Sequence, residues 1–551
     1  MSLRELKDLE IKIDSEVAQL AIWKLPVRAI LTAVHYSLYT FFRTDREKAI
    51  TVAGRMSHLV QFLAKCPAEP TGASALDAFS AYMEMDPKIE QLMLAINYSH
   101  FSEVMPQVHR GYYSVTKVNE KHLRLDHAST ELANAETRDI VLSELAMPHI
   151  AAPPPNVQAE IQQLAHVAPK VDLKLMSRVL GSYIDHYLKH IVEPPLLSDE
   201  TLIDAFGLNN AELARFTALL LAIASYAIDL SKAIEPRARA EAKGLSAVEA
   251  EWLEWVSVCW KEDFLRHLLN AVTTDASKID ALLSIFSLNF RVDPPQTDRG
   301  GEGYFPPMAL LRGESVVIGP YLTFLYAHTR NVLYALQRLD QTKFDEVVSH
   351  GLEPQILLHA QSMLRRLPGV DVVPNVVWDT GEIDLLVFEE ASNTALQIQA
   401  KAAIAPYGTR MISRLEGRVR EGIRQLQDFR ALPQEKIDAI ISKAVGKTVS
   451  GVRLVDAVLA RSCFGSKSSW SNSAGVCFVS LAILEELTKS GKIANINELP
   501  RLVAIYLDSV ILQAGPIWTH KPLRLGEWTL EVPMLDFNQR YLDRERIRVW
   551  A

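Results

Sequence analysis

The sequence predicts an α+β protein of several domains, with a large all-α amino-terminal half followed by a smaller α/β core. The chain has 551 residues, which is long for a single domain, so two to four domains are expected. Apolar residues recur at helical spacing through most of the first 286 positions, whereas residues 381–401 alternate with a period of two. The first pattern predicts packed helices, and the second predicts strands.

Two helical domains are expected in the first half, at residues 1–148 and 157–286. Three consecutive prolines within residues 150–156 favour an extended polyproline conformation, so we interpret this segment as a linker. The expected helices include residues 16–25, 27–42, 49–65, 74–98, 172–191, 210–233 and 247–272.

The second helical domain carries two features that invite a different interpretation. Its most apolar run, residues 216–228, is too short to span a bilayer, and we interpret it as part of a buried helix. Trp252, Trp255 and Trp260 are expected to pack in the helical core, which is commoner for such residues than an aromatic binding surface.

Residues 287–339 are predicted to form an irregular connector and a helix that braces the α/β core. Proline and glycine pairs interrupt residues 293–307, so a loop is expected there, followed by a strand at 315–318 and a helix at 321–339. At the far end of the chain, residues 500–551 are predicted to be a β-rich extension. Its expected elements are strands at 502–506 and 528–532 and an arginine-rich charged tail at 540–548.

Residues 381–401, GEIDLLVFEEASNTALQIQAK, organise the predicted α/β core. Read with a period of two, they divide into two strands joined by a polar turn, which predicts a hairpin. Folding this hairpin brings Asp384 close to Gln399 and Lys401. A carboxylate, an amide and an ammonium group are therefore expected to cluster at one edge of the sheet.

This cluster contains ligands that a hard cation such as Mg²⁺ or Mn²⁺ prefers, namely carboxylate and carbonyl oxygens. Asp384 can supply a carboxylate, and Gln399 can supply a neutral side-chain oxygen. Lys401 can orient or deprotonate a water molecule, or neutralise charge on a phosphate as it is attacked. Each residue alone has a plainer interpretation: Asp384 as a turn residue and Lys401 as a charge that protects a sheet edge.

Asp384 followed by Gln399-Ala400-Lys401 resembles the D…(D/E/Q)-x-K core of the PD-(D/E)XK, or restriction-endonuclease-like, nuclease superfamily. The resemblance covers about residues 340–485, and glutamine stands where glutamate is commoner. It implies a core of helix, three strands, helix and strand, which we place at residues 340–499. It also implies a divalent metal ion held by Asp384, Gln399 and an acidic residue on the first helix.

The flanking segments follow the order that the resemblance implies. Residues 344–367 have helical periodicity, and Pro354 favours a helix that starts near Glu353. Glu353 is therefore the expected acid on the first helix and the third metal ligand, with Glu346 as the second choice. The other expected elements are strands at 370–378 and 452–460, a helix at 437–444, a Ser-rich surface loop at 462–474 and a final strand and helix at 476–489.

Residues 410–430 are predicted to form an amphipathic helix whose polar face is mostly arginine. On a wheel of about 100° per residue, its apolar residues fall within about 120°. Guanidinium groups match phosphate oxygens, although intervening acidic residues also allow a simple solvated face. Gln425 begins a Q-x-x-x-(Y/F) sequence that resembles the helix motif of the RecB-like branch of the superfamily. The predicted nucleic-acid-binding residues are Arg410, Arg414, Arg418, Arg424 and Gln425.

Composition limits the other possibilities. The net charge of −8 excludes a generic basic coat, so any nucleic acid must bind at a local patch. The four cysteines lack C-x-x-C spacing, which argues against a zinc ribbon or a disulfide framework. Because the first residues are charged and unlike a secretory signal, a cytoplasmic location without membrane association is expected.

The sequence as a whole predicts a metal-dependent nuclease that acts on DNA. The helical half is expected to regulate the nuclease or to dock a protein partner, an arrangement that fits microbial antiviral defence. One alternative is a nuclease fold that has lost catalysis and serves as a nucleic-acid-binding or protein-interaction scaffold. Another is a helical adaptor that binds only protein.

Overall fold

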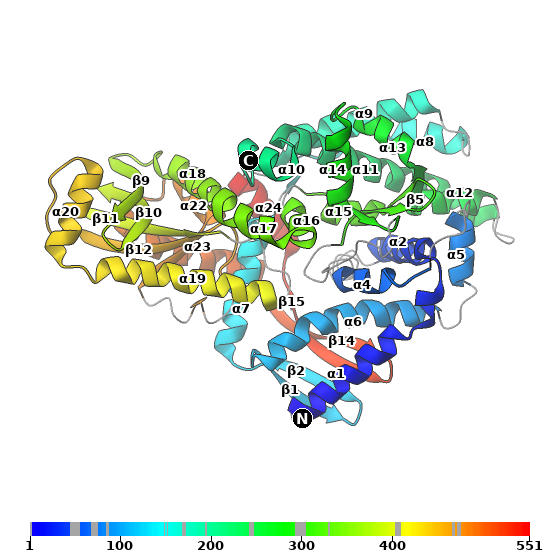
Figure 1. Cartoon of the computed structure of the whole chain (residues 1–551), viewed down its shortest axis with the longest axis horizontal. Helices are drawn as coiled ribbons and strands as arrows, with labels where there is room; N and C mark the ends of the chain where they lie inside the picture. Colours follow the sequence, from blue (N-terminus) through cyan, green and yellow to red (C-terminus); the bar gives the residue numbers. More distant parts are fainter. Residues whose placement is uncertain are drawn as a thin grey trace.

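The computed structural model describes residues 3–44, 56–67, 75–83, 88–147, 149–150, 152–167, 172–192, 195–241, 247–291, 305–328, 331–402, 409–465, 469–470 and 475–550. Figure 1 shows an α/β lobe on the left, a helical block at the upper right, and a lower region where the first helices meet strands from the end of the chain. The glycine-rich loop expected at residues 300–303 lies outside the described residues.

The first 109 residues are helical where they are described, as expected. Two strands then form a hairpin, so the prediction that residues 1–148 are all-α is wrong at residues 113–127. The elements are α1 (Leu3–Ala18), η1 (Ala21–Lys24), α2 (Val27–Thr44), η2 (Met56–Leu59), α4 (Val60–Leu63), α5 (Ala75–Met83), α6 (Lys88–His109), β1 (Tyr113–Asn119), β2 (His122–His127) and α7 (Thr130–Leu145).

The hairpin is stabilised by strands from the other end of the chain. β2 pairs in parallel with β15 (Trp528–Asp536), which pairs with β14 (Ile517–Leu525), giving the sheet order β1-β2-β15-β14. In β2, Leu123 and Leu125 are buried and alternate with more exposed polar residues, which is a strand pattern. This alternating pattern is short, and it is flanked by helical segments. The strand that pairs with β2 lies about 400 positions away in the sequence, so the local sequence does not indicate the sheet.

The predicted β-rich extension at residues 500–551 is only partly a sheet. Residues 502–506 lie in α23 (Leu499–Ala514), so the strand predicted there is wrong, and the arginine-rich tail lies in α24 (Gln539–Trp550). The second predicted strand, 528–532, is confirmed within β15. Short apolar runs do not distinguish a strand from a buried helix. Here the buried residues recur at helical spacing: Val503, Tyr506, Leu507 and Val510.

The middle of the chain is a helical block that carries a small sheet. The elements are β3 (His149–Ile150), α8 (Gln158–Val167), α9 (Leu173–His190), β4 (Ile191–Val192), α10 (Asp199–Phe206), α11 (Asn210–Glu241), α12 (Ala247–Val256), β5 (Val258–Lys261), α13 (Glu262–Leu269), α14 (Ala276–Phe286), β6 (Ser287–Asn289), β7 (Met308–Leu311), β8 (Ser315–Ile318), α15 (Pro320–Tyr326) and α16 (Asn331–Leu339). β5 to β8 form one sheet in the order β5-β8-β7-β6.

This block confirms some predictions and corrects others. The strand expected at 315–318 is β8, but the helix expected at 247–272 is interrupted by β5, and that expected at 321–339 is divided between α15 and α16. Trp252 and Trp255 pack against the apolar core, as predicted, and Trp252 meets the rings of Tyr36 and Tyr39 edge-on.

Within the described residues, one helix, Asn210–Ala238, is long and apolar enough to cross a membrane, and 83% of its most apolar window is buried inside the fold. A bent pair, Arg4–Lys24 with Val27–Thr44, passes the same test only as one broken span. The packing of Asn210–Ala238 is that of a core helix.

The α/β core begins with α17 (Gln341–Val347) and a single π-helical turn, η3 (Val348–Leu352). It continues with α18 (Glu353–Leu364), β9 (Val370–Trp378), β10 (Gly381–Glu389), β11 (Thr394–Lys401), α19 (Thr409–Arg430), α20 (Gln434–Val445), β12 (Arg453–Ala460), β13 (Val476–Ser480), α22 (Leu481–Lys489) and η4 (Ile496–Glu498). The sheet order is β13-β12-β11-β10-β9. β9, β10 and β11 pair antiparallel, whereas β11, β12 and β13 pair in parallel.

The apolar core does not divide at the predicted domain boundaries. One buried cluster extends from Leu6 to Val549 and includes residues from every predicted domain. A second, smaller cluster lies where β9 and β10 meet α19 and α20.

Polar contacts between described residues join the amino-terminal region to the α/β core. Tyr112 donates its hydroxyl to Glu416 on α19, at 3.0 Å. Buried Asp139 on α7 accepts the Phe464 backbone N–H at 3.2 Å and the Trp470 indole N–H at 2.9 Å, and burial raises its pKa to about 8. The segment expected to be a surface loop at 462–474 is therefore packed in its described part: Ser462, Cys463, Phe464 and Ser469 are all buried.

Candidate functional site

The predicted hairpin is confirmed, and its two strands separate at the predicted site. β10 and β11 pair from Leu385–Ile398 to Glu389–Thr394, and the pairing stops before Asp384. Side chains replace the missing backbone bonds. The Asp384 Oδ2 atom accepts the N–H of Ala400 at 2.7 Å, and the Gln399 Nε2 atom donates to the Glu382 carbonyl at 2.6 Å. Asp384 and Gln399 therefore both lie where the strands diverge.

The backbone is distorted at the same point on the neighbouring strand. In the β9–β10 register, Asn375 falls opposite Asp384, and Asn375 has a positive φ of 53°. Ile383 and Leu386 are three positions apart, so in a regular strand they would point to opposite faces of the sheet. They pack in the same apolar cluster, so the alternation of side chains in β10 is interrupted between them. Positive φ at a non-glycine residue is strained, and such residues concentrate at functional sites.

Glu353 reaches this site from the start of α18, where the sequence placed it. Its Oε2 atom accepts the N–H of Ala402 at 3.4 Å, directly after the end of β11. A π-helical turn, η3, precedes α18, and such turns are frequent at functional sites. The second choice, Glu346, lies in α17 and pairs with Lys343 at 3.5 Å.

Gln399 and Lys401 are buried against helix α19. Gln399 is 1% exposed and Lys401 is 7% exposed. The Oε1 atom of Gln399 is buried without a hydrogen-bond partner, and such an unpaired buried oxygen is costly unless a ligand satisfies it. This oxygen is the atom that a divalent cation would use.

The surroundings of Asp384 disfavour its negative charge in the absence of a cation. Burial raises the pKa of its carboxyl to about 7, and the nearby Glu353 and Glu382 carboxylates act in the same direction. Lys401 and the Ala400 N–H act to lower it. Glu382 was not among the predicted site residues, although its alternation with Asp384 along β10 was visible in the sequence.

The site holds only two carboxylates of the predicted ligand set. Within the described part of the chain there is no group of three or more His, Cys, Asp or Glu side chains suited to a metal ion. Asp384, Glu353 and the free oxygen of Gln399 nevertheless offer three oxygens of the kind that Mg²⁺ or Mn²⁺ binds, and such ions commonly keep several water ligands. The residues present therefore fit a hard cation with an incomplete protein shell.

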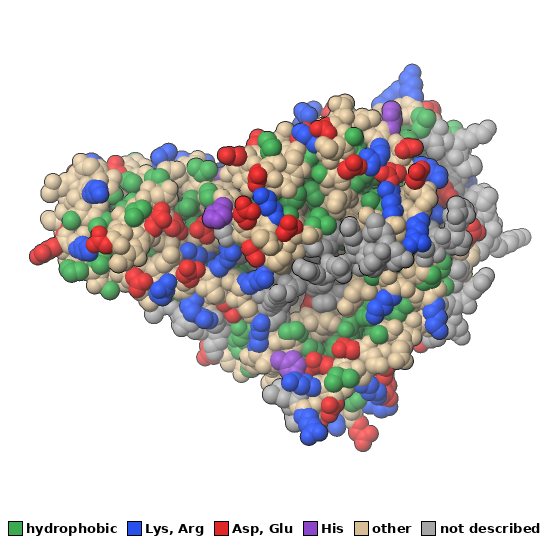
Figure 2. Space-filling view, in the orientation of Figure 1, with side chains coloured by type: hydrophobic (Ala, Val, Ile, Leu, Met, Phe, Trp, Pro, Cys, Tyr) green, Lys and Arg blue, Asp and Glu red, His purple; other side chains and the backbone are tan. Residues whose placement is uncertain are grey.

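The arginines of α19 divide into two kinds. Arg418 donates to the Ala402 carbonyl at 3.0 Å and so helps to fix the end of β11. Arg424 is exposed and lies 4.0 Å from Asp428. Arg414 is half-buried, and the side chain of Arg410 lies outside the described residues. Figure 2 shows basic side chains mixed with acidic ones in the region of α19, rather than an unbroken basic surface.

The glutamine motif of α19 lies on the face of the helix that packs against the candidate site. Gln425 follows Gly422 by about one helical turn, and Gly422 is the residue against which Lys401 packs. The Gln425 Oε1 atom is buried without a partner. Phe429, the last residue of the motif, is buried and meets Trp378 edge-on.

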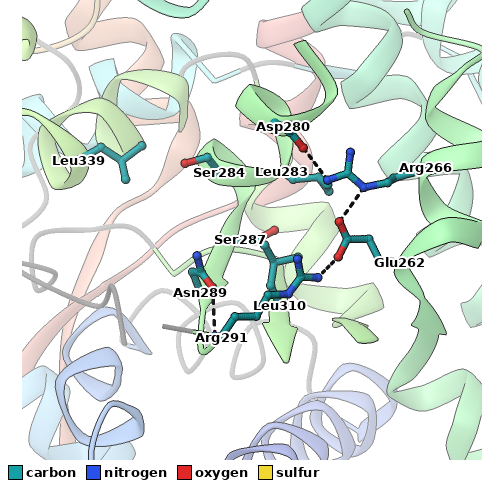
Figure 3. Close-up of a pocket in the computed structure, with 10 residues that line it drawn as sticks. All are labelled: Glu262, Arg266, Asp280, Leu283, Ser284, Ser287, Asn289, Arg291, Leu310 and Leu339. Carbon is teal, nitrogen blue, oxygen red and sulfur yellow. Dashed lines mark hydrogen bonds and ion pairs between the residues drawn. The ribbon is translucent and has the colours of Figure 1, made fainter. Parts of the chain in front are cut away.

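A separate cavity of about 140 Å³ lies in the helical block (Figure 3). The Glu262 carboxylate binds both Arg266 and Arg291, and Arg266 also pairs with Asp280. Because these guanidinium groups are already paired with carboxylates, we interpret the cluster as a structural tie between α13, α14 and the strand end at Arg291. Sequence reasoning did not find it, because its residues are scattered singly among apolar neighbours.

Comparison of the chain with protein-family models, with curated proteins and with solved structures finds no match. The proposals below therefore depend on the site itself.

Proposed function

We propose that the chain is a metal-dependent nuclease of the PD-(D/E)XK type that hydrolyses phosphodiester bonds, with DNA as the favoured substrate. The observation that carries the proposal is the convergence of Asp384, Gln399 and Glu353 at the point where β10 and β11 diverge. The order α18, β9, β10, β11, α19, α20 and β12 supports a restriction-endonuclease-like core, because it follows the helix, three strands, helix and strand that the resemblance implies, with α20 as an additional helix.

Each residue has a role that its surroundings support. The carboxylates of Asp384 and Glu353 and the free oxygen of Gln399 would hold Mg²⁺ or Mn²⁺, which would supply Lewis-acid activation of the scissile phosphate. The bond from the Ala400 N–H fixes the Asp384 carboxylate. Lys401 would orient the attacking water or neutralise charge on the phosphate.

The exposed part of α19 is the proposed phosphate-backbone surface. Arg424 and Arg414 are available for such contacts, whereas the hydrogen bond from Arg418 to the Ala402 carbonyl gives Arg418 a structural role as well. Contacts of this kind carry no base information, so any sequence preference would come from other residues.

The amino-terminal half is proposed to control this nuclease or to dock a protein partner, as in an antiviral defence system of the microbial cytoplasm. The contacts of Tyr112 with Glu416 and of Asp139 with Phe464 support a physical coupling between the two parts. No membrane partner is proposed.

The test is to incubate the purified full chain with circular and linear DNA and with RNA, with Mg²⁺, with Mn²⁺ or with a chelator. The proposal expects cleavage that requires the metal ion. Cleavage of RNA alone would correct the substrate, and cleavage that continues in the chelator would contradict the metal-dependent mechanism.

A second candidate is a nuclease fold without catalysis that binds nucleic acid or protein as a scaffold. The specific observation that favours it is the neutral Gln399, whose amide nitrogen is already bonded to the Glu382 carbonyl. It expects DNA binding that does not depend on metal and is not followed by cleavage. A chain that binds no DNA even at low salt would instead be an adaptor that binds only protein.

A further inference from the structure

Helix α19 contacts strand β11 along a single stripe of residues. Arg418 donates to the carbonyl of Ala402, Gly422 lies against Lys401 and Gln399, and the carbonyl of Leu426 accepts the amide of Gln397 at 3.3 Å. Residues 418, 422 and 426 are four positions apart and therefore share one face of the helix. This face follows the last residues of β11, which are the residues that carry the candidate site.

Gly422 is the point of closest approach in this stripe. A Cβ atom at this position would lie 2.8 Å from the Cε atom of Lys401 and 3.3 Å from its Cγ atom. It would also lie 3.6 Å from the Cβ atom of Gln399. The first distance is too short for two carbon atoms, so any larger residue would displace either the Lys401 side chain or the helix.

The backbone of α19 does not itself require glycine here. Gly422 is not among the residues with positive φ, and glycine inside a helix costs about 1 kcal/mol relative to alanine. Gly417, in the same helix, provides the contrast, because it is exposed and its Cβ would meet nothing within 4 Å. The two glycines therefore differ in their surroundings: Gly422 is buried against Lys401 and Gln399, whereas Gly417 faces open space.

We propose that Gly422 is a positioning residue, which lets α19 approach β11 closely enough to fix the Lys401 side chain at the end of β11, where the candidate site lies. Lys401 directly follows Ala400, whose N–H is bonded to Asp384. A displaced Lys401 side chain would change the position of its ammonium group relative to this site. Gly422 acts through Lys401 and touches no substrate. The effect of Gly422 on catalysis rests on the proposed function. The packing of Lys401 against Gly422 does not depend on it.

The packing is tested first, without any assay of activity. Gly422→Ala and Gly417→Ala are compared by urea denaturation, in the wild-type chain and in the Lys401→Ala background. We expect Gly422→Ala to lower the denaturation midpoint only where Lys401 is present, and Gly417→Ala to leave it unchanged or raise it in both backgrounds. An equal effect of Gly422→Ala in both backgrounds would overturn the inference.

The catalytic consequence is tested by single-turnover DNA cleavage with Mg²⁺. We expect Gly422→Ala to lower the rate about tenfold or more while DNA binding stays unchanged, with no further loss when it is added to Lys401→Ala. If the wild type cleaves and Gly422→Ala cleaves as fast as Gly417→Ala, the positioning role is wrong. If the wild type does not cleave, the proposed function fails, and the denaturation result still decides the packing of Lys401.

Discussion

Asp384 accepts the backbone N–H of Ala400 at 2.7 Å, at the point where β10 and β11 cease to pair. The carboxylate therefore accepts the hydrogen bond that a backbone carbonyl would accept in a continuous ladder. The charged side chain of Asp384 thus lies where the two strands separate. A side chain fixed in this way is pre-organised for a ligand, because its geometry is set by the sheet. Burial of the charged Asp384 carboxylate is unfavourable without a bound cation. The predictions below concern this carboxylate and the arginines of α19.

Metal affinity is expected to depend on pH through Asp384. The pKa of this carboxyl is about 7 in the metal-free protein, so a proton competes with the metal ion below that pH. Affinity for Mn²⁺, measured by calorimetry, should rise as the pH increases from 5 to about 7 and then level off, with release of a proton on binding. An affinity that does not change over this range would contradict the assignment of Asp384 as a ligand.

Asp384→Asn is expected to stabilise the metal-free protein while removing activity. The folded pKa of about 7 lies above the ordinary value of 3.8, so the folded chain retains a proton that the unfolded chain releases between these values. The contribution to stability is present at low pH and is lost as the pH rises to about 7. At pH 8 we expect a gain of about 2 kcal/mol in the free energy of unfolding, measured by denaturation in a chelator. A loss of stability at pH 8 would show that the charged carboxylate is already well compensated.

Two arginines of α19 are expected to respond in opposite ways to truncation. Arg418→Ala removes the bond to the Ala402 carbonyl and should cost about 1–3 kcal/mol of stability. Arg424→Ala should leave stability unchanged, because its side chain is 69% exposed, and should reduce the slope of log affinity against log salt by about 0.9. Denaturation and salt-dependent DNA binding distinguish the two, and identical behaviour of the two variants would contradict the division.

Much of the α/β core could be predicted from the sequence, because its signals are local. Strand β9, the hairpin of β10 and β11, and the start of α18 at Glu353 follow from alternation, a polar turn and Pro354. The grouping of Asp384, Gln399 and Glu353 in one site was also predicted from the sequence, whereas their hydrogen bonds to backbone groups of β10, of β11 and of Ala402 were not. Glu382 alternates with Asp384 in the sequence, but it was missed because the D…(D/E/Q)-x-K motif gives no role to an acid two positions before the aspartate.

The errors lie where distant segments meet. β1 and β2 were expected to be helical, and their sheet is completed by β14 and β15 from the last 35 residues of the chain. No local pattern in residues 113–127 indicates that β2 pairs with β15. Asp139 was missed for the same reason, because its role depends on Phe464 and Trp470, more than 300 positions away.

Asp139 gives a prediction about the coupling of the two parts. Burial raises its pKa to about 8 from the ordinary value of 3.8, so its contribution to stability declines as the pH rises between these values. The hydrogen bonds from Phe464 and Trp470 use the Oδ1 atom, which asparagine also has. Asp139→Asn should therefore keep the contacts and flatten the decline of melting temperature between pH 5 and 8. An unchanged decline would mean that other groups control it.

The role of Asp384 and Lys401 in hydrolysis is tested most directly by the Mg²⁺-dependent rate of DNA cleavage, measured for the wild type, Asp384→Asn and Lys401→Ala. We expect each variant to remain folded and to lower the single-turnover rate by about a hundredfold or more, while DNA binding is retained. Cleavage at the wild-type rate by both variants would contradict this role, because the hydrolysis would then take place elsewhere in the molecule.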